Sequence, residues 1–262
     1  MKRVILTCMA TTVIATSTVG AEFTFDKVPK KLPAYYLATL QSVNSIKTKL
    51  RKNGFEVVAS DNILSGTTVI TFTNRELKST NSYMATLHIL VNRNDNEIRV
   101  QNPSYLASAY IKGYKYGDFK KTLNGLERVL NRMSPVLQQK EMDALPEYHF
   151  MFGMPYLEDV ITVATDVTMP HKSISYSLKL PNGAILVGHK LTAKTNKFLE
   201  KIGQSKNVQL LPYESMIKNG VATILDPKYY LALSLPNLSM GEFMRIATIP
   251  DSITKEIQRS YR

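Results

Sequence analysis

In residues 35–54, apolar residues recur with the period of an α-helix. Spacings of three and four place one apolar side chain on each turn of the same face, and Gly54 follows where such a helix would end. We therefore predict an amphipathic helix here, with lysines and arginines on its opposite face. Its apolar face would consist of Tyr36, Leu40, Val43, Ile46 and Leu50.

The same period returns in residues 117–133. Asp118 precedes this segment and is of the residue type that caps a first helical turn. The pattern predicts a second amphipathic helix. Its buried face would consist of Phe119, Leu123, Leu126 and Leu130.

Short stretches rich in β-branched and aromatic residues separate the two predicted helices. They occupy residues 55–60, 67–74, 83–92 and 98–101, and a polar Asn- and Asp-rich turn joins the last two. This composition predicts four strands, of which the last two form a hairpin. One helix, several strands and another helix together predict an α+β fold.

Part of this pattern occurs twice in the chain. Residues 102–119 align without a gap with residues 226–243, and both stretches follow a strand–turn–strand pattern. We interpret the match as an internal duplication. Each Asx-Pro pair should end a strand, and each Gly-acid-Phe triplet should open a helix. The identical pairs are Pro103 and Pro227, Tyr105 and Tyr229, Gly117 and Gly241, and Phe119 and Phe243.

The repeat divides the chain into two similar predicted units, each an antiparallel sheet with helices packed on one side. The first unit would span residues 22–132 and the second residues 149–262, with residues 133–148 as a polar linker. The segments "GFEVVAS", "IRVQNPSYLA" and "LLPYESMIKNGVATILDPKYYLA" resemble the domain-of-unknown-function family 302. The resemblance implies small α+β domains and no established activity. The second unit departs from that pattern, because no opening helix followed by Gly-Phe is visible in it.

The amino terminus has the layout of a secretory signal peptide. Lys2 and Arg3 precede an apolar stretch that ends in small residues, and cleavage would follow Ala21. We therefore expect residues 1–21 to be removed and the protein to be periplasmic or secreted. A retained membrane anchor is the alternative, although the stretch is shorter than the roughly 20 apolar residues that cross a bilayer.

Cysteine content and charge narrow the class of protein further. Cys8, the single cysteine, lies in the predicted signal peptide, so the mature chain would have neither disulfides nor thiolate metal sites. The chain carries 33 Lys and Arg against 21 Asp and Glu, and most of the excess lies in the first half. This excess predicts either an anionic partner surface or a solvated basic face. We expect no nucleic acid partner, because no nucleic-acid-binding motif is present.

The sequence does not favour an enzyme. It contains no nucleophile elbow, zinc-binding helix, phosphate-binding loop or dinucleotide fingerprint, and its four histidines are scattered. His88 and His189 lie in strand-like segments, where a hydrogen-bonded structural histidine is expected. We therefore assign no catalytic residue and no cofactor.

The segment "YHFMFGMPY", residues 148–156, has three interpretations. As packing, Met151 and Phe152 would be buried at the contact between the two units. As a lining segment, it would face a ligand. As a soft-metal site, His149, Met151 and Met154 would bind Cu(I), because thioether and imidazole ligands suit that ion.

Together these observations predict an exported, non-enzymatic binding or structural module. Its ligand would be a small molecule or an envelope component, held in a cleft between the two units. A periplasmic copper-binding protein is the alternative. The candidate lining residues are His149, Met151, Met154, Tyr110, Tyr114 and Tyr116.

Overall fold

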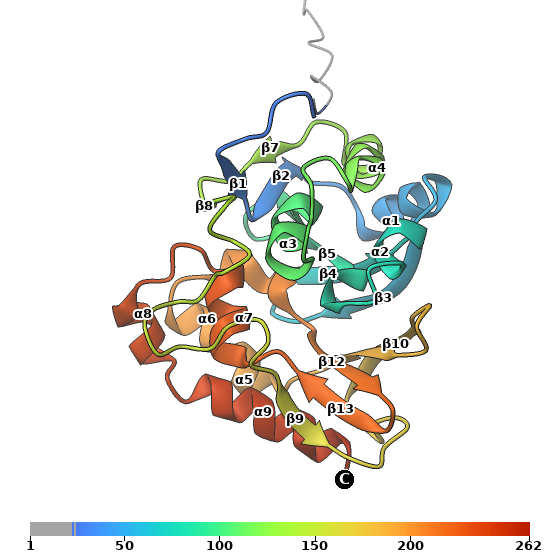
Figure 1. Ribbon diagram of the computed structural model, residues 1–262. Coiled ribbons are helices and arrows are strands. Elements are labelled where there is room, and N and C mark those ends of the chain that lie inside the picture. The colour runs from blue at the N-terminus through green and yellow to red at the C-terminus, as the bar shows by residue number, and fades with distance from the viewer. Residues whose placement is uncertain (1–22, 24) are drawn as a thin grey trace, which may run out of the picture.

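The computed structural model describes residue 23 and residues 25–262 (Figure 1). The predicted signal peptide lies outside the described residues. Helices and antiparallel sheets are both present, so the predicted α+β class is confirmed. In Figure 1 the second half of the chain, coloured yellow to red, lies below the first half.

The first half forms a sheet of six strands in which all neighbours are antiparallel. Alternate residues of each strand therefore point to opposite faces. In spatial order the strands are β3 (Glu56–Asn62), β4 (Thr67–Thr73), β5 (Leu87–Asn92), β6 (Glu97–Gln101), β2 (Tyr35–Thr39) and β7 (Ser134–Pro135).

One face of this sheet is covered by two helices, α1 (Val43–Lys52) and α4 (Lys120–Leu130). Ile46 and Leu50 of α1 are fully buried. Beside them the Phe55 and Phe72 rings meet edge to face, with centroids 5.4 Å apart. The short helix α2 (Arg75–Lys78) and the 3₁₀ turn η1 (Tyr83–Ala85) connect β4 to β5.

The predicted first helix is wrong for its first eight residues, because Tyr36 lies in strand β2. That strand pairs with β6 on one side and β7 on the other, so its backbone groups are satisfied in the sheet. The helix begins at Val43, where the Ser42 side chain accepts a hydrogen bond from the Ser45 N–H. Tyr36 and Leu40 matched the helical spacing without belonging to the helix.

The second predicted helix is present as α4, but Asp118 does not cap it. Phe119 occupies the cap position without a side-chain hydrogen bond to the helix. The Asp118 carboxylate instead accepts from the Lys115 N–H, 2.8 Å away, within the preceding turn. The predicted strand over 83–92 is also shortened, because residues 83–85 form the turn η1.

The second half forms a five-stranded antiparallel sheet with helices around it. Its strands, in spatial order, are β10 (Ile174–Lys179), β11 (Ile185–His189), β12 (Tyr213–Lys218), β13 (Val221–Ile224) and β9 (Ile161–Ala164). The helical elements are α5 (Ala193–Asn196), α6 (Phe198–Lys201), η2 (Ser205–Leu210), α7 (Pro227–Ser234), α8 (Met240–Arg245) and α9 (Ile249–Ser260).

The two sheets share one strand order. The series β3-β4-β5-β6-β2 of the first half and β10-β11-β12-β13-β9 of the second visit their strands in the same sequence. In each half the hairpin leads into a buried helix, α3 (Pro103–Tyr110) or α7, with proline at its start. Asn102 and Asp226 cap these helices through their side chains. A duplication remains a prediction that this shared order supports.

The expected helix start at Gly-acid-Phe is not observed in either half. Gly117 lies in the turn before α4, whose first residue is Lys120. Gly241 lies inside α8, which begins at Met240 because Ser239 forms a capping box with Glu242. The aligned residues therefore occupy different positions relative to their helices.

Reciprocal contacts join the two halves. Turn η2 of the second half packs on β4, β5 and β6, whereas η1 of the first half packs on β12. The Tyr83 hydroxyl donates to the Thr223 carbonyl at 3.0 Å, and Arg99 donates to Asn207 at 3.1 Å. The main hydrophobic core is continuous through both halves.

Residues 133–148, the predicted linker, contribute two short strands. Strand β7 extends the six-stranded sheet, and β8 (Gln139–Glu141) pairs with β1 (Lys31–Pro33). The segment is therefore held against the first half before the chain enters the second.

Candidate functional site

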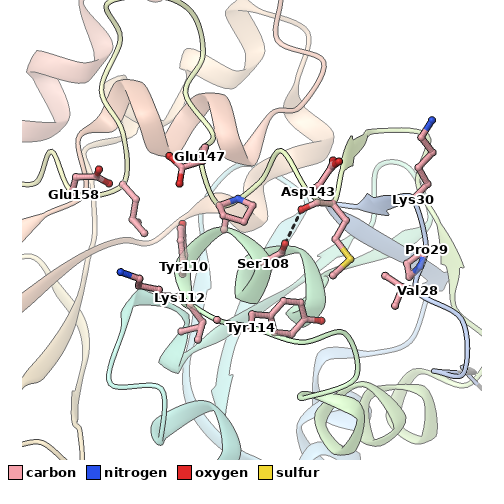
Figure 2. Close-up of a pocket in the computed structure, with 16 residues that line it drawn as sticks. Val28, Pro29, Lys30, Ser108, Tyr110, Lys112, Tyr114, Asp143, Glu147 and Glu158 are labelled. Carbon is pink, nitrogen blue, oxygen red and sulfur yellow. Dashed lines mark hydrogen bonds between the residues drawn. The ribbon is translucent and has the colours of Figure 1, made fainter.

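A cavity of about 970 Å³ lies where α3 ends and residues 142–158 pass over it (Figure 2). We call it the α3 pocket. It combines an apolar floor with charged groups at its edge. Its lining residues are Val28, Pro29, Lys30, residues 108–114, Met142, Asp143, Pro146, Glu147, Leu157 and Glu158.

The end of α3 forms the centre of this pocket. The helix stops after Tyr110, where the Ile111 N–H donates to the Ala107 carbonyl at 2.9 Å. Gly113 then turns the chain with φ of +79°, a conformation that favours glycine. The Ser108 hydroxyl donates to the Met142 carbonyl at 3.1 Å, which ties the helix to the segment that passes over it.

Charged side chains are distributed around the rim. Asp143, Glu147 and Glu158 bring three carboxylates, whereas Lys30 and Lys112 bring two ammonium groups. Figure 2 shows the two lysine side chains at opposite sides of the pocket. In the described part of the chain, none of these five groups forms a salt bridge with another of them.

Two of the three predicted tyrosines line the α3 pocket. These are Tyr110 and Tyr114, whose rings contribute to its floor. Burial raises the pKa of both phenols, so both stay protonated at neutral pH. Tyr116 does not line the pocket, because its ring packs against Phe25 at a centroid distance of 5.5 Å.

The predicted residues of "YHFMFGMPY" also lie outside the α3 pocket. The His149 ring packs at a tilt against Tyr156 with centroids 4.5 Å apart, and its Nδ1 lies 3.3 Å from the Glu147 carbonyl. Met151 is 41% exposed, and Met154 packs partly buried against the core. A Cu(I) site formed by these side chains remains a prediction.

The expected burial of Met151 and Phe152 between the units is wrong. Phe152 is 99% exposed. The Met154 N–H donates to the Met151 carbonyl, so residues 151–154 form a tight turn with Phe152 at its tip. The aromatic residue that packs is Phe150, whose ring lies 5.2 Å from that of Phe243.

A polar cluster is buried where the two halves meet, and the sequence did not reveal it. The Thr86 and Tyr176 hydroxyls both contact Oε1 of Glu214. His88 lies beside them, and its Nδ1 is 2.7 Å from the Gln209 carbonyl. His88 was predicted as a structural histidine, but nothing near Glu214 in the sequence indicates that its carboxylate is buried.

No His, Cys, Asp and Glu side chains gather in threes as a metal site would require, over the residues that the structure describes. Within the same residues, no helix has the length and apolar character needed to cross a membrane.

Comparison with known proteins gives no relative for this chain. No family model matches it, and neither a curated protein nor a solved structure matches it. The resemblance to the domain-of-unknown-function family 302 therefore stays a prediction. Function has to be argued from the site itself.

Proposed function

We propose that this protein is an exported, non-enzymatic binding module whose ligand occupies the α3 pocket. The observation that carries the proposal is the pocket itself, with about 970 Å³ of space over an apolar and aromatic floor. Pockets for small organic ligands have this size, mostly apolar lining and few polar groups. The ligand class is accordingly a small organic molecule.

The polar groups of the pocket suit binding better than catalysis. Ser108 is 4% exposed, and its hydroxyl is already used in the hydrogen bond to Met142. The buried tyrosine phenols have raised pKa values and are poor bases at neutral pH. These features support recognition of a ligand that leaves unchanged.

Native mass spectrometry of the protein purified from its own compartment tests this proposal. We expect an added mass on the wild-type protein and its loss in Ile111→Trp, which places an indole in the pocket. The matched control is Leu137→Trp, because Leu137 is 93% exposed and does not line the pocket. An added mass that survives Ile111→Trp would place the ligand elsewhere and contradict the proposal.

Export is part of the same proposal and rests on the sequence of residues 1–21. Amino-terminal sequencing of the mature protein should begin at Glu22. Retention of Met1 on a cytoplasmic protein would contradict it.

We also propose that the basic excess serves contact with an anionic surface. Helices α1 and α4 pack side by side on one face of the first sheet. Helix α1 contains no acidic residue. Positive side chains concentrated on neighbouring helices attract anionic lipid or polymer more strongly than scattered ones. We call the exposed basic side chains on and next to these two helices the basic face. They are Arg51, Lys52, Lys120, Lys121 and Arg132.

A further inference from the structure

We propose that the α3 pocket takes an organic cation, a protonated amine or guanidinium carried on an apolar or aromatic body. This inference rests on the proposed function and names the ligand class of the same pocket. Three features support it: the unpaired end of helix α3, the contrasting end of helix α7, and the carboxylates of the rim.

Among the described residues, no group donates a hydrogen bond to the last carbonyls of α3. In the described part of the chain, the carbonyl oxygens of Ser108, Ala109 and Tyr110 accept neither a backbone nor a side-chain hydrogen bond. These oxygens point along the axis toward the carboxyl end of a helix, where the helix dipole places partial negative charge. All three residues line the pocket. The floor of the pocket therefore offers acceptors to a donor, and best to a positively charged one.

At the corresponding end of α7, side chains of the protein itself satisfy such carbonyls. Each of the last three carbonyls of α7 accepts from a tyrosine hydroxyl of residues 35–148. The Tyr148 hydroxyl donates to Ala232 at 3.1 Å, Tyr105 to Leu233 at 2.9 Å and Tyr35 to Ser234 at 2.6 Å.

The two helices occupy the same place in their halves, since each follows the hairpin and begins with proline. At α7 the donors are hydroxyls on aromatic bodies that belong to the chain. At α3 the equivalent space is the pocket. A ligand that combines a donor group with an apolar body would fill it in the same manner.

The charged side chains at the rim of the pocket favour a positively charged donor over a neutral one. Asp143, Glu147 and Glu158 outnumber Lys30 and Lys112, and none of the three carboxylates is paired with either lysine. Figure 2 shows Glu147 and Glu158 on the same side of the pocket as Lys112, so two carboxylates face one ammonium group there. An ammonium group there would meet two carboxylates, and the neighbouring tyrosine rings would favour it further.

Fluorescent probes with one apolar body and different head groups test the ligand class. We would titrate dansyl cadaverine, which carries a primary ammonium, against a dansyl-aminohexanoate and an N-hexyl dansylamide of similar length. The expected result is binding of the cation at least about tenfold tighter than the carboxylate, with the neutral probe between them. Equal affinity for the three probes, or preference for the carboxylate, would overturn the cation proposal.

Two sets of variants separate this inference from the proposed function. The double variant Glu147→Gln and Glu158→Gln should reduce the preference for the cation severalfold and leave the neutral probe unaffected. The control, Glu200→Gln and Asp251→Asn, removes two exposed carboxylates outside the pocket. It should change neither the preference for the cation nor the affinity for the neutral probe.

Ile111→Trp should weaken binding of all three probes, because it fills the pocket. If the probes bind the wild type without charge preference and Ile111→Trp abolishes binding, the proposed function is supported and the proposed cationic ligand class is contradicted. If no probe binds, or if Ile111→Trp has no effect on binding, the proposed function itself fails.

Discussion

His88 and Glu214 meet across the contact between the two sheets, with Nε2 of His88 3.8 Å from Oε1 of Glu214. His88 is the second residue of β5 and Glu214 the second residue of β12, six-residue strands that both lie third in the spatial order of their sheets. The His88 side chain is 3% exposed and the Glu214 side chain 10% exposed. The shared strand order of the two halves thus brings an imidazole and a carboxyl together at equivalent positions.

The surroundings of His88 and Glu214 determine which atoms of the two side chains carry a proton. Because the Nδ1 of His88 faces the Gln209 carbonyl, it has to carry a hydrogen, and a neutral ring then presents a lone pair at Nε2. Burial lowers the pKa of His88 from 6.5 to about 4 and raises the pKa of Glu214 from 4.5 to about 7. Both groups are therefore held in their uncharged forms in mildly acidic solution.

The first prediction concerns the pH dependence of folding in Glu214→Gln. Folded Glu214 keeps a proton that the unfolded chain releases above pH 4.5, so its contribution is full below pH 4.5 and lost as the pH rises through about 7. The free energy of unfolding of the wild type, minus that of the variant, should therefore fall across this window. Urea unfolding at intervals from pH 4 to pH 8 measures the difference.

His88→Asn should show the opposite sign. The His88 contribution is full above pH 6.5, where the unfolded ring is neutral too, and is lost as the pH falls through about 4. Glu200→Gln, at an exposed carboxylate, serves as the control for both variants. A wild-type-minus-Glu214→Gln difference that is constant from pH 4.5 to pH 7 would show that the buried carboxyl titrates normally.

The second prediction concerns the tyrosine hydroxyls at the end of α7. Tyr105→Phe removes the donor to the Leu233 carbonyl while keeping the ring, and leaves that buried carbonyl without a partner. We expect a loss of about 1–3 kcal/mol in the free energy of unfolding. Tyr156→Phe is the control, because Tyr156 is 38% exposed, and it should change stability by less than about 0.5 kcal/mol. Equal losses in the free energy of unfolding for the two substitutions would contradict the stabilising role of the Tyr105 hydroxyl.

The third prediction separates two neighbouring phenylalanines. Phe152→Ala should change the free energy of unfolding by less than about 0.5 kcal/mol, since the ring is exposed. Phe150→Ala should cost about 1–3 kcal/mol, because its ring packs against Phe243. Thermal or urea unfolding of the two variants measures both. A larger loss of stability in Phe152→Ala than in Phe150→Ala would contradict this prediction and support the burial of Phe152 that we expected from the sequence.

The fourth prediction concerns the basic face of α1 and α4. The wild-type protein should sediment with vesicles that contain anionic lipid, and added salt should release it. Substituting Gln at Arg51, Lys52, Lys120 and Lys121 should weaken this binding severalfold. The same change at Lys194, Lys197, Lys201 and Lys255, which are exposed lysines of the second half, should weaken it less. Equal losses in both sets would indicate that net charge alone, and not this face, governs binding.

Local features of the fold could be predicted because neighbouring residues determine them. Apolar spacing in residues 117–133 indicated α4, and β-branched stretches around a polar turn indicated the hairpin of β5 and β6. The Asx-Pro pairs were predicted to end strands, and β6 and β13 do end just before them, although the helices α3 and α7 that begin there were not predicted. Tyr110 and Tyr114 line the α3 pocket, and their role in binding a ligand stays a prediction.

Tertiary contacts decided the rest. Tyr36 has the spacing of a helical residue, but it lies in β2 because β6 and β7 pair with that strand from both sides. Phe152 is apolar yet exposed, because a tight turn places it away from the core. No pattern along the chain records which strands become neighbours, or which side of a turn meets solvent.

The candidate site depends on such long-range contacts as well. The sequence predicted that a strand ends at Asn102, but it predicted neither the helix α3 that follows nor that the last carbonyls of this helix need partners. Only the tertiary structure decided that residues 142–158 would pass over this end and leave a cavity, while three tyrosine hydroxyls reach the end of α7. The same holds for His88 and Glu214, whose burial follows from the packing of two sheets that are far apart along the chain. Local chemistry fixes which groups require a partner, and packing between distant segments fixes which partner each one receives.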